Sequence, residues 1–259
     1  MITSKLLYAV AGLVLGFAAG FFFADQANRK ELDRLRAGVA QAGTGTASTA
    51  GAKPSGNDAP AANGEKTSLT DDELRKVIAK ADASPTNIDL QRKVGQGLYL
   101  YAARFNKPDL LPEAIRVLKR AEAAAPQDYD TLVMLGNAEF DFARASDPAH
   151  LKEARAYYAK ALAQKPADIN VRTDMGLTYY FDKPSDPKRA IQEYRRSLAQ
   201  DPRHEMTLQN LAAALIATGE LTEAQQRLDQ LESVNAANPA LSDLRAQLAQ
   251  HRNAAGGAK

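Results

Sequence analysis

Prolines at regular intervals constrain this chain more than any other feature of its sequence. They stand at the start of four similar segments and are separated by 41, 40 and 36 residues: Pro85, Pro126, Pro166 and Pro202. Proline lacks a backbone N–H and fixes φ, so it ends one helix and starts the next. A period of this length predicts a stack of similar helical units, each burying its apolar face only against its neighbours. We expect four units, over residues 85–125, 126–165, 166–201 and 202–238.

Each unit has the pattern of two packed helices. Nine and ten residues after each proline, an apolar residue is followed by a small one: Val94-Gly95, Leu135-Gly136, Met175-Gly176 and Leu211-Ala212. A second helix then begins at an alanine, with a large residue four positions later on the same face: Leu118, Tyr158, Tyr194 and Leu228. Large residues opposite small ones are typical of antiparallel helix pairs, and no alternation of β type appears after residue 70.

These elements resemble the tetratricopeptide repeat (TPR) family, whose basic unit is 34 residues. The resemblance covers about residues 69–250, and three units are longer because of proline-containing loops between their helices. It implies an all-α, TPR-type α-solenoid of antiparallel helix pairs over residues 69–252. Thr70 and Glu73 form a capping-box pattern that predicts an N-terminal half-repeat, and residues 240–250 predict a capping helix. We expect residues 253–259 to be disordered.

The resemblance also implies a concave groove lined by the first helix of each repeat. A protein or peptide partner would bind there. The groove positions would hold Arg92, Gln96, Tyr99, Asn137, Phe140, Asp141, Thr173, Tyr180, Phe181 and Gln209. The alternative is that the aromatic residues of this set pack beneath the inter-helix loops. Only Arg92 is basic, which disfavours the TPR clamp that holds the acidic tails of chaperones.

The first 24 residues predict a membrane anchor. Leu6 to Ala24 carries no charge over 19 residues, about the length that crosses a bilayer. A cleaved signal peptide is the alternative, but Phe21-Phe22-Phe23 continues the apolar run beyond the candidate cut after Gly20. Glycines recur on one face of this helix, a pattern that favours self-association into a homodimer: Gly12, Gly16 and Gly20. We expect a helix over residues 25–41 and a disordered linker over 42–68, which is rich in Ala, Gly, Ser, Thr and Pro.

Composition and motifs argue against catalysis and against nucleic-acid binding. Of 33 basic and 31 acidic side chains, the first 69 residues hold seven and five, so 26 of each remain in the repeat region. This neutral balance lacks the positive field of a nucleic-acid binder. The absence of cysteine excludes disulfides and thiolate metal sites, and the three histidines are scattered. We find no phosphate loop or nucleophile motif, and expect a non-enzyme without cofactor or metal.

Two signals disagree on which side of the membrane carries the repeats. Lys5 precedes the apolar segment and four basic residues follow it, which by the positive-inside rule favours the cytoplasm. The anchor and linker instead look like those of bacterial envelope proteins. We expect an inner-membrane protein with periplasmic repeats, and the cytoplasmic orientation stays open.

The predicted function is that of an anchored scaffold. A weaker resemblance links residues 69–95 to the anchored TPR subunits of cytochrome c biogenesis, which present apocytochrome to a haem-attaching enzyme. The alternatives are a chaperone-like accessory subunit of a secretion machine and a regulatory adaptor facing the cytoplasm.

Overall fold

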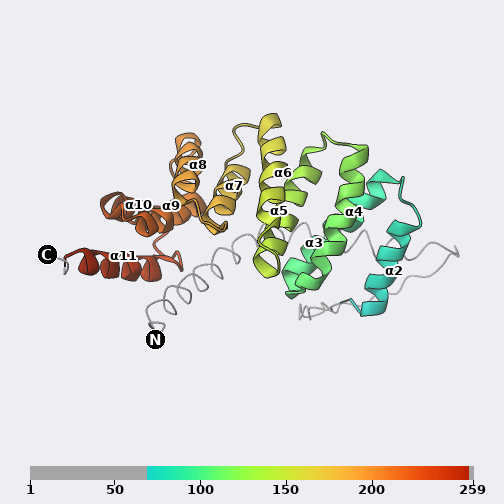
Figure 1. Cartoon of the computed structure of the whole chain (residues 1–259), viewed down its shortest axis with the longest axis horizontal. Coiled ribbons are helices and arrows are strands. Elements are labelled where there is room, and N and C mark those ends of the chain that lie inside the picture. The colour runs from blue at the N-terminus through green and yellow to red at the C-terminus, as the bar shows by residue number, and fades with distance from the viewer. Residues whose placement is uncertain (1–68, 257–259) are drawn as a thin grey trace, which may run out of the picture.

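The computed structural model describes residues 69–256 and shows a row of helices along one long axis (Figure 1). Within this range the chain contains no strand. The elements are α2 (Asp71–Asp82), α3 (Ile88–Phe105), the 3-10 helix η1 (Pro108–Leu110), α4 (Leu111–Ala124), α5 (Tyr129–Ala145), α6 (His150–Gln164), α7 (Ile169–Phe181), α8 (Pro187–Gln200), α9 (Glu205–Thr218), α10 (Leu221–Val234) and α11 (Leu241–Gly256). The all-α solenoid predicted for the repeat region is confirmed over these residues.

Four helix pairs make up the repeats. The helices of each pair pack against each other, and they are α3 with α4, α5 with α6, α7 with α8, and α9 with α10. The second helix of each pair also packs against the first helix of the next. α2 packs on α3, whereas α11 packs on α10 and α9. Every repeat therefore has a packed neighbour on both sides. This cover is needed because a single repeat cannot bury its apolar face alone.

The start of the first helix in three repeats follows from a polar residue placed two positions after the proline. Asn87, Asp128 and Asp168 each accept a hydrogen bond from the backbone N–H three residues later, at 3.0, 3.1 and 3.0 Å. Such N-caps satisfy backbone donors that the first turn leaves free. His204 stands at this place in the fourth repeat, and its side chain contacts Asn170 at 3.0 Å instead.

The small residue of each first helix is the point where its partner helix comes closest. A Cβ atom added to the glycine would overlap the large residue of the second helix. The contacts are Gly95 with Leu118 Cγ at 2.6 Å, Gly136 with Tyr158 Cε1 at 2.4 Å, and Gly176 with Tyr194 Cε1 at 2.4 Å. The pairing of small and large residues expected from the sequence is confirmed in three repeats. The fourth has Ala212 and Leu228 at these positions, both fully buried.

The N-terminal helix α2 begins with the predicted capping box. Thr70 Oγ1 accepts from the backbone N–H of Glu73 at 3.3 Å, and Glu73 Oε2 accepts from the backbone N–H of Thr70 at 2.8 Å. Glu73 Oε2 also accepts from the Thr70 hydroxyl at 2.9 Å. The hydrogen bonds from the Thr70 backbone N–H and hydroxyl lower the pKa of the Glu73 carboxyl, because both favour its charged form. The half-repeat therefore starts where the sequence pattern places it.

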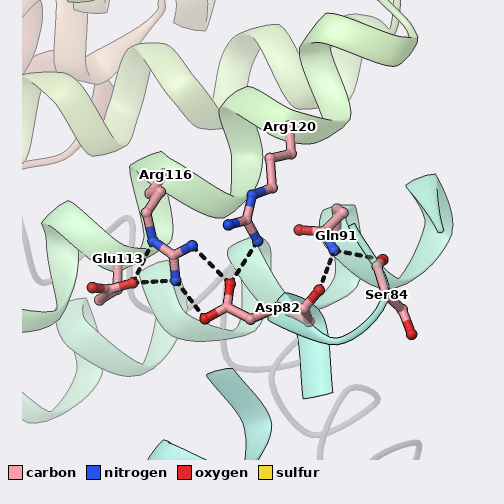
Figure 2. Close-up of polar contacts among 7 residues, drawn as sticks. Asp82, Ser84, Gln91, Glu113, Arg116 and Arg120 are labelled. Atoms are coloured by element: carbon pink, nitrogen blue, oxygen red, sulfur yellow. Dashed lines mark hydrogen bonds and ion pairs between the residues drawn. The ribbon is translucent and has the colours of Figure 1, made fainter. Parts of the chain in front are cut away.

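Polar contacts attach the end of α2 to the first repeat (Figure 2). Asp82 accepts from Arg116 Nη1 at 2.7 Å and from Arg120 Nη1 at 2.6 Å, both on α4. These two guanidinium groups lower the pKa of Asp82 to about 2. Beside them, the fully buried Gln91 donates from Nε2 to the backbone oxygens of Ala81 and Ser84 at 2.7 and 2.9 Å. Gln91 thereby satisfies carbonyls that the end of α2 leaves without a helical partner.

The apolar interior divides into two clusters that meet at α7. The first cluster extends from Leu74 to Val171, and the second extends from Ala190 to Leu248. Leu177 of α7 packs against both. Helix α7 therefore connects the two clusters.

Neighbouring first helices lie closer together than neighbouring second helices. α3 contacts α5, α5 contacts α7, and α7 contacts α9, whereas no comparable contact joins α4 to α6 or α6 to α8 in the described part of the chain. A stack whose first helices lie closer together bends toward them. We call the surface formed by α3, α5, α7 and α9 the inner face.

Several predictions concern residues outside the described range. They are the anchor (residues 1–24) with its glycines Gly12, Gly16 and Gly20, the helix over 25–41 and the linker over 42–68. Between residues 69 and 256, none of the helices has both the length and the apolar character needed to span a bilayer. At the C-terminus, α11 continues to Gly256, beyond the expected end of order at Asn253, because Ala254 and Ala255 favour helix.

Candidate protein-binding face

The inner face offers a mixture of open and occupied side chains. Gln96 on α3 is half-exposed and makes no hydrogen bond within the described residues, and Lys93 beside it is exposed. Ala213 on α9 is also half-exposed. At the two ends of the face, the side chains are therefore available to a partner.

Tyr99 is less accessible than the sequence suggests. Its side chain is buried, and its hydroxyl donates to Asp141 Oδ2 on α5 at 3.0 Å. This hydrogen bond joins the first helices of two repeats. Burial raises the pKa of the Asp141 carboxyl to about 6, while the bond from Tyr99 and the charge of Arg144 oppose that rise. Two of the predicted groove residues therefore contact each other directly.

The remaining aromatic residues form a cluster between α5 and α7. The rings of Phe140 and Phe181 are 6.2 Å apart between centroids, and those of Phe181 and Tyr180 are 5.3 Å apart in an edge-to-face arrangement. The Arg144 guanidinium lies 3.9 Å from the centroid of the Phe181 ring. These contacts join the first helices of two neighbouring repeats. The loop after α7 does reach this end, because Ser185 Oγ donates to the backbone oxygen of Tyr180 at 2.6 Å.

Thr173 does not reach the inner surface, contrary to the prediction. Its side chain is fully buried, and its hydroxyl contacts the backbone oxygen of Ile169 at 2.7 Å and Thr207 Oγ1 at 2.6 Å. Ser197 Oγ lies 3.3 Å away. The hydroxyl finds these partners in α8 and α9, so it forms a buried polar contact between two repeats.

Three other predicted residues are partly engaged within the protein. Arg92 pairs with Asp89 at 2.9 Å and with Asp128 at 3.5 Å. Asn137 Oδ1 accepts from the Tyr158 hydroxyl at 2.9 Å. Gln209 Oε1 accepts from an asparagine of the turn before α11 at 3.3 Å. All three are half-exposed, so their remaining polar atoms can still meet a partner.

Sequence reasoning missed Asp174, which has an unusual environment. It is half-exposed on α7 and has no hydrogen-bond or ion-pair partner among the described residues. Burial is the main cause that raises its pKa to about 7, and the negative charges of Asp141 and Asp168 add to this effect. The eighth residue after each proline was not among the expected groove positions. Asp174 is an acid at this position, where the other repeats have Lys93, Met134 and Asn210.

Tyr194 was expected only as a packing residue, yet its hydroxyl is unpaired. The side chain is fully buried, and its oxygen has no hydrogen-bond partner within residues 69–256. Tyr158 and Tyr194 cover Gly136 and Gly176 in the same way. The Tyr158 hydroxyl reaches Asn137, one residue after Gly136, whereas Leu177 follows Gly176 and offers no acceptor. A comparison of the repeats would have revealed this difference, because the residue after the glycine is polar in the second repeat and apolar in the third.

The described residues contain no group of three or more His, Cys, Asp or Glu side chains that could hold a metal ion. The arrangement is suited to non-covalent recognition, through aromatic rings, amides and carboxylates on the inner face.

Comparisons with known proteins agree with this architecture. A family model described as tetratricopeptide repeat matches residues 184–248. No curated protein resembles the chain in sequence. Together with the solved structures below, the family match supports a TPR protein with a TPR-like helical solenoid.

Solved structures of similar fold include MamA and two TPR proteins. MamA has 19% identity and a TM-score of 0.51, over 63% of this chain and 86% of MamA. YrrB, a TPR protein with an unusual peptide-binding site, has 17% identity and a TM-score of 0.53, over 68% of this chain and 84% of YrrB. A TPR protein from Parabacteroides merdae has 22% identity and a TM-score of 0.50, over 61% of this chain and 60% of that protein. At these identities the likeness concerns the fold alone.

Proposed function

We propose that this chain is a membrane-anchored TPR scaffold that binds a protein or peptide partner on its inner face. The TPR fold is that of a protein–protein interaction scaffold. The observation that carries the proposal is the continuous layer of first helices, which contact one another from α3 to α9. Such a layer presents half-exposed side chains such as Gln96, Asn137 and Ala213 along a single surface.

A peptide ligand is supported by the chemistry of this face. Aromatic rings and amides suit an extended segment, because the rings bury apolar side chains and the amides bind its backbone. YrrB, which shares the fold, has a peptide-binding site. We infer that the chain acts by binding alone, without catalysis or a cofactor.

Photo-crosslinking in native membranes tests the binding face. A crosslinking residue at Gln96, on the inner face, should capture a protein partner that mass spectrometry identifies. The matched control is the same residue at the exposed Ala159 of α6, a second helix. Equal capture at both positions, or capture at Ala159 alone, would refute binding on the inner face.

The identity of the partners separates the finer proposals. Our first proposal is an envelope scaffold with periplasmic repeats, of which cytochrome c maturation is a sharper form. It predicts crosslinks to proteins that handle apocytochrome. Crosslinks to secretion or translocation components would instead support the accessory-subunit alternative.

Fusion of alkaline phosphatase to the C-terminus tests the orientation. Activity supports periplasmic repeats, whereas an inactive phosphatase together with a fluorescent fusion supports a cytoplasm-facing adaptor. For the proposed homodimer, Gly16→Ile should abolish self-association of residues 1–24 in a membrane reporter assay. An unchanged signal would remove that part of the proposal.

A further inference from the structure

Basic side chains gather around Tyr179, on the side of the third repeat where its two helices are joined. The ring of Tyr179, near the end of α7, is half-exposed and lies between two guanidinium groups. The Cζ atom of Arg155 on α6 is 4.9 Å from the ring centroid, and that of Arg189 on α8 is 5.1 Å from it. Arg155 is also bonded to Asp182, at 2.5 Å. Arg189 is exposed and has no ion-pair partner within residues 69–256.

Three lysines extend this group of cations. Lys152 lies one turn before Arg155 on α6, Lys183 follows Asp182 in the loop after α7, and Lys188 is in the first turn of α8. Although burial opposes it, the bond from Arg155 and the charge of Lys152 lower the pKa of Asp182, so Lys152 lies near this loop. All three lysines are exposed, and none has an ion-pair partner among the described residues. We name this surface the basic patch, and its members are Lys152, Tyr179, Lys183, Lys188 and Arg189.

Few acids offset these charges. The loop between α7 and α8 holds two, and both are engaged: Asp182 is paired with α6, and Asp186 accepts from the backbone N–H of Arg189 at 3.0 Å. Glu153 on α6 shares the helix face of Tyr157, four residues later, and not the face that reaches the patch. The four cations of the patch and the neighbouring arginine of α6, against the two acids of the loop, leave a net charge of 5 − 2 = +3.

Helix stability does not explain these cations. The residue before the first buried alanine of each second helix is acidic in three repeats and basic in the third: Glu113, Glu153, Arg189 and Glu223. The helix dipole favours acids in a first turn and disfavours cations there, yet α8 has no acid in its first turn and carries Lys188 and Arg189. The third repeat therefore carries charges that its own folding does not need.

The chain enters the repeats on the corresponding side of the stack. The first residues at α2 contact the end of α3, because the Tyr101 hydroxyl donates to the backbone oxygen of Leu69 at 3.2 Å and Lys107 Nζ is 3.5 Å from Asp71 Oδ1. In an antiparallel stack, the end of each first helix is the side that carries the loop within the repeat. The entry of the chain and the loop between α7 and α8 are therefore on the same side, and residues 1–68 precede this entry.

We propose that the basic patch docks the repeats onto the anionic headgroups of the membrane in which the chain is anchored. This proposal rests on the proposed function, because the anchor must bring the patch to a bilayer. Each cation that reaches an anionic membrane surface favours docking by about fivefold. Tyr179 suits the same region, since tyrosine is enriched at the level of lipid headgroups.

The patch fits a lipid surface better than an acidic protein segment. An arginine binds a carboxylate through two parallel hydrogen bonds, but the guanidinium of Arg155 is already bonded to Asp182 and that of Arg189 lies over Tyr179. The three lysines are exposed point charges with flexible stems, which adapt to many headgroups without a fixed geometry. The patch thus has charge and reach without the directed contacts that select one peptide.

Fluorescence quenching of the full-length chain in lipid nanodiscs tests the docking. The chain has no cysteine, so a single introduced cysteine can carry a fluorophore. Gln192→Cys places it on α8, one turn after Arg189, and the matched control Gln226→Cys places it at the same position of α10 in the fourth repeat; both glutamines are exposed. The nanodiscs contain phosphatidylcholine alone or with anionic phosphatidylglycerol, and a spin-labelled headgroup quenches a fluorophore that lies near the bilayer.

We expect strong quenching at position 192 in the anionic nanodiscs only. High salt should remove it, because exposed charges are screened. Position 226 should show the same weak quenching with both lipids, since α10 has an acidic residue in its first turn.

Removal of patch charges should weaken docking without unfolding the repeats. The triple variant Lys183→Gln, Lys188→Gln and Arg189→Gln should lower the docking equilibrium constant by about 100-fold, at about fivefold for each cation. Its melting temperature should not fall, because these side chains are exposed and make no ion pair within the described residues. The charge-matched control removes three exposed cations elsewhere and should dock like the parent chain: Lys76→Gln, Lys80→Gln and Arg203→Gln.

The outcomes separate this proposal from the proposed function. Incorporation of the chain into nanodiscs reports on the anchor by itself. If the chain is incorporated but position 192 is quenched equally with both lipids, or the triple variant docks like the parent, membrane docking is refuted while the anchored scaffold stands. A glutamate-rich peptide that binds through Arg189, without quenching in anionic nanodiscs, would overturn the proposal in favour of an acidic protein partner. A chain that is not incorporated would refute the anchor and this docking, but not peptide binding on the inner face.

Discussion

Because Gly136 lies so close to Tyr158, we expect Gly136→Ala to destabilise the protein. The same substitution at Gly97, another glycine in a first helix, should stabilise it. In Gly136→Ala, the new Cβ would lie 2.4, 2.5 and 3.0 Å from Cε1, Cδ1 and Cζ of the Tyr158 ring. In Gly97→Ala, the new Cβ would meet no atom within 4 Å. Both substitutions add the same methyl group to a helix interior, so their comparison isolates the contact.

The magnitude follows from these distances. Carbon atoms in contact normally lie about 3.5–4.0 Å apart, so the Tyr158 ring must move by roughly 1 Å. The ring cannot move easily, because it is buried and its hydroxyl is bonded to Asn137. Overpacking of this kind costs about 1–3 kcal/mol, and we expect the upper end. Replacing glycine by alanine returns about 1 kcal/mol of helix propensity, which leaves Gly136→Ala about 2 kcal/mol less stable.

Urea unfolding followed by far-UV circular dichroism checks both variants. Gly136→Ala should lower the free energy of unfolding by about 2 kcal/mol and the melting temperature by about 4–8 °C. Gly97→Ala should raise the free energy of unfolding by up to about 1 kcal/mol. The loss at Gly136 should shrink in a Tyr158→Leu background, since Ala212 and Leu228 already occupy these two positions in the fourth repeat. A stable Gly136→Ala, matching Gly97→Ala, would refute the argument that close approach requires glycine here.

Three further predictions concern polar groups. The pKa of Asp174 is raised to about 7, so the folded chain holds the proton of this carboxyl more tightly than the unfolded chain does. The stability that the protonated carboxyl contributes is therefore present below about pH 4 and is lost as pH rises through 7. Asp174→Asn should therefore be more stable than the parent chain at pH 8 but not at pH 4, by urea unfolding. Asp82→Asn should increase hydrogen exchange in α2 without affecting α9, because it weakens the contact with Arg116 and Arg120. In the parent chain this contact should weaken only as pH falls from about 4 toward 2, because the pKa of Asp82 is lowered. Gln91→Leu should cost about 1–3 kcal/mol, because it leaves the buried carbonyl oxygen of Ala81 and the partly buried one of Ser84 without this donor. An unchanged free energy of unfolding would show that water replaces the amide.

The repeat architecture could be read from the sequence because its determinants are local or periodic. Proline and a capping residue two positions later define where the first helix starts in three of the four repeats. The pairing of Gly136 with Tyr158 joins residues only 22 positions apart within one repeat. Spacing alone therefore predicts the helix pairs, since the same short-range contacts recur in each unit.

The chemistry of the inner face was decided only by the tertiary structure. Thr173 and Gln96 were both expected on this surface, yet Thr173 is buried against α8 and α9 while Gln96 is half-exposed. Asp141 was identified, but its bond to Tyr99 joins two repeats and cannot be read from one. Asp174 was not expected at all.

The physical reason is the range of the interactions. Helix formation and pairing within a repeat depend on neighbours along the chain, so the sequence by itself determined an all-α stack with its helices in register. Burial and pKa depend on all groups nearby in space, and at the inner face these come from three successive repeats. Only the packed structure decided that Thr173 is buried against Thr207 of the next repeat, and that Leu177 leaves the Tyr194 hydroxyl unpaired among residues 69–256.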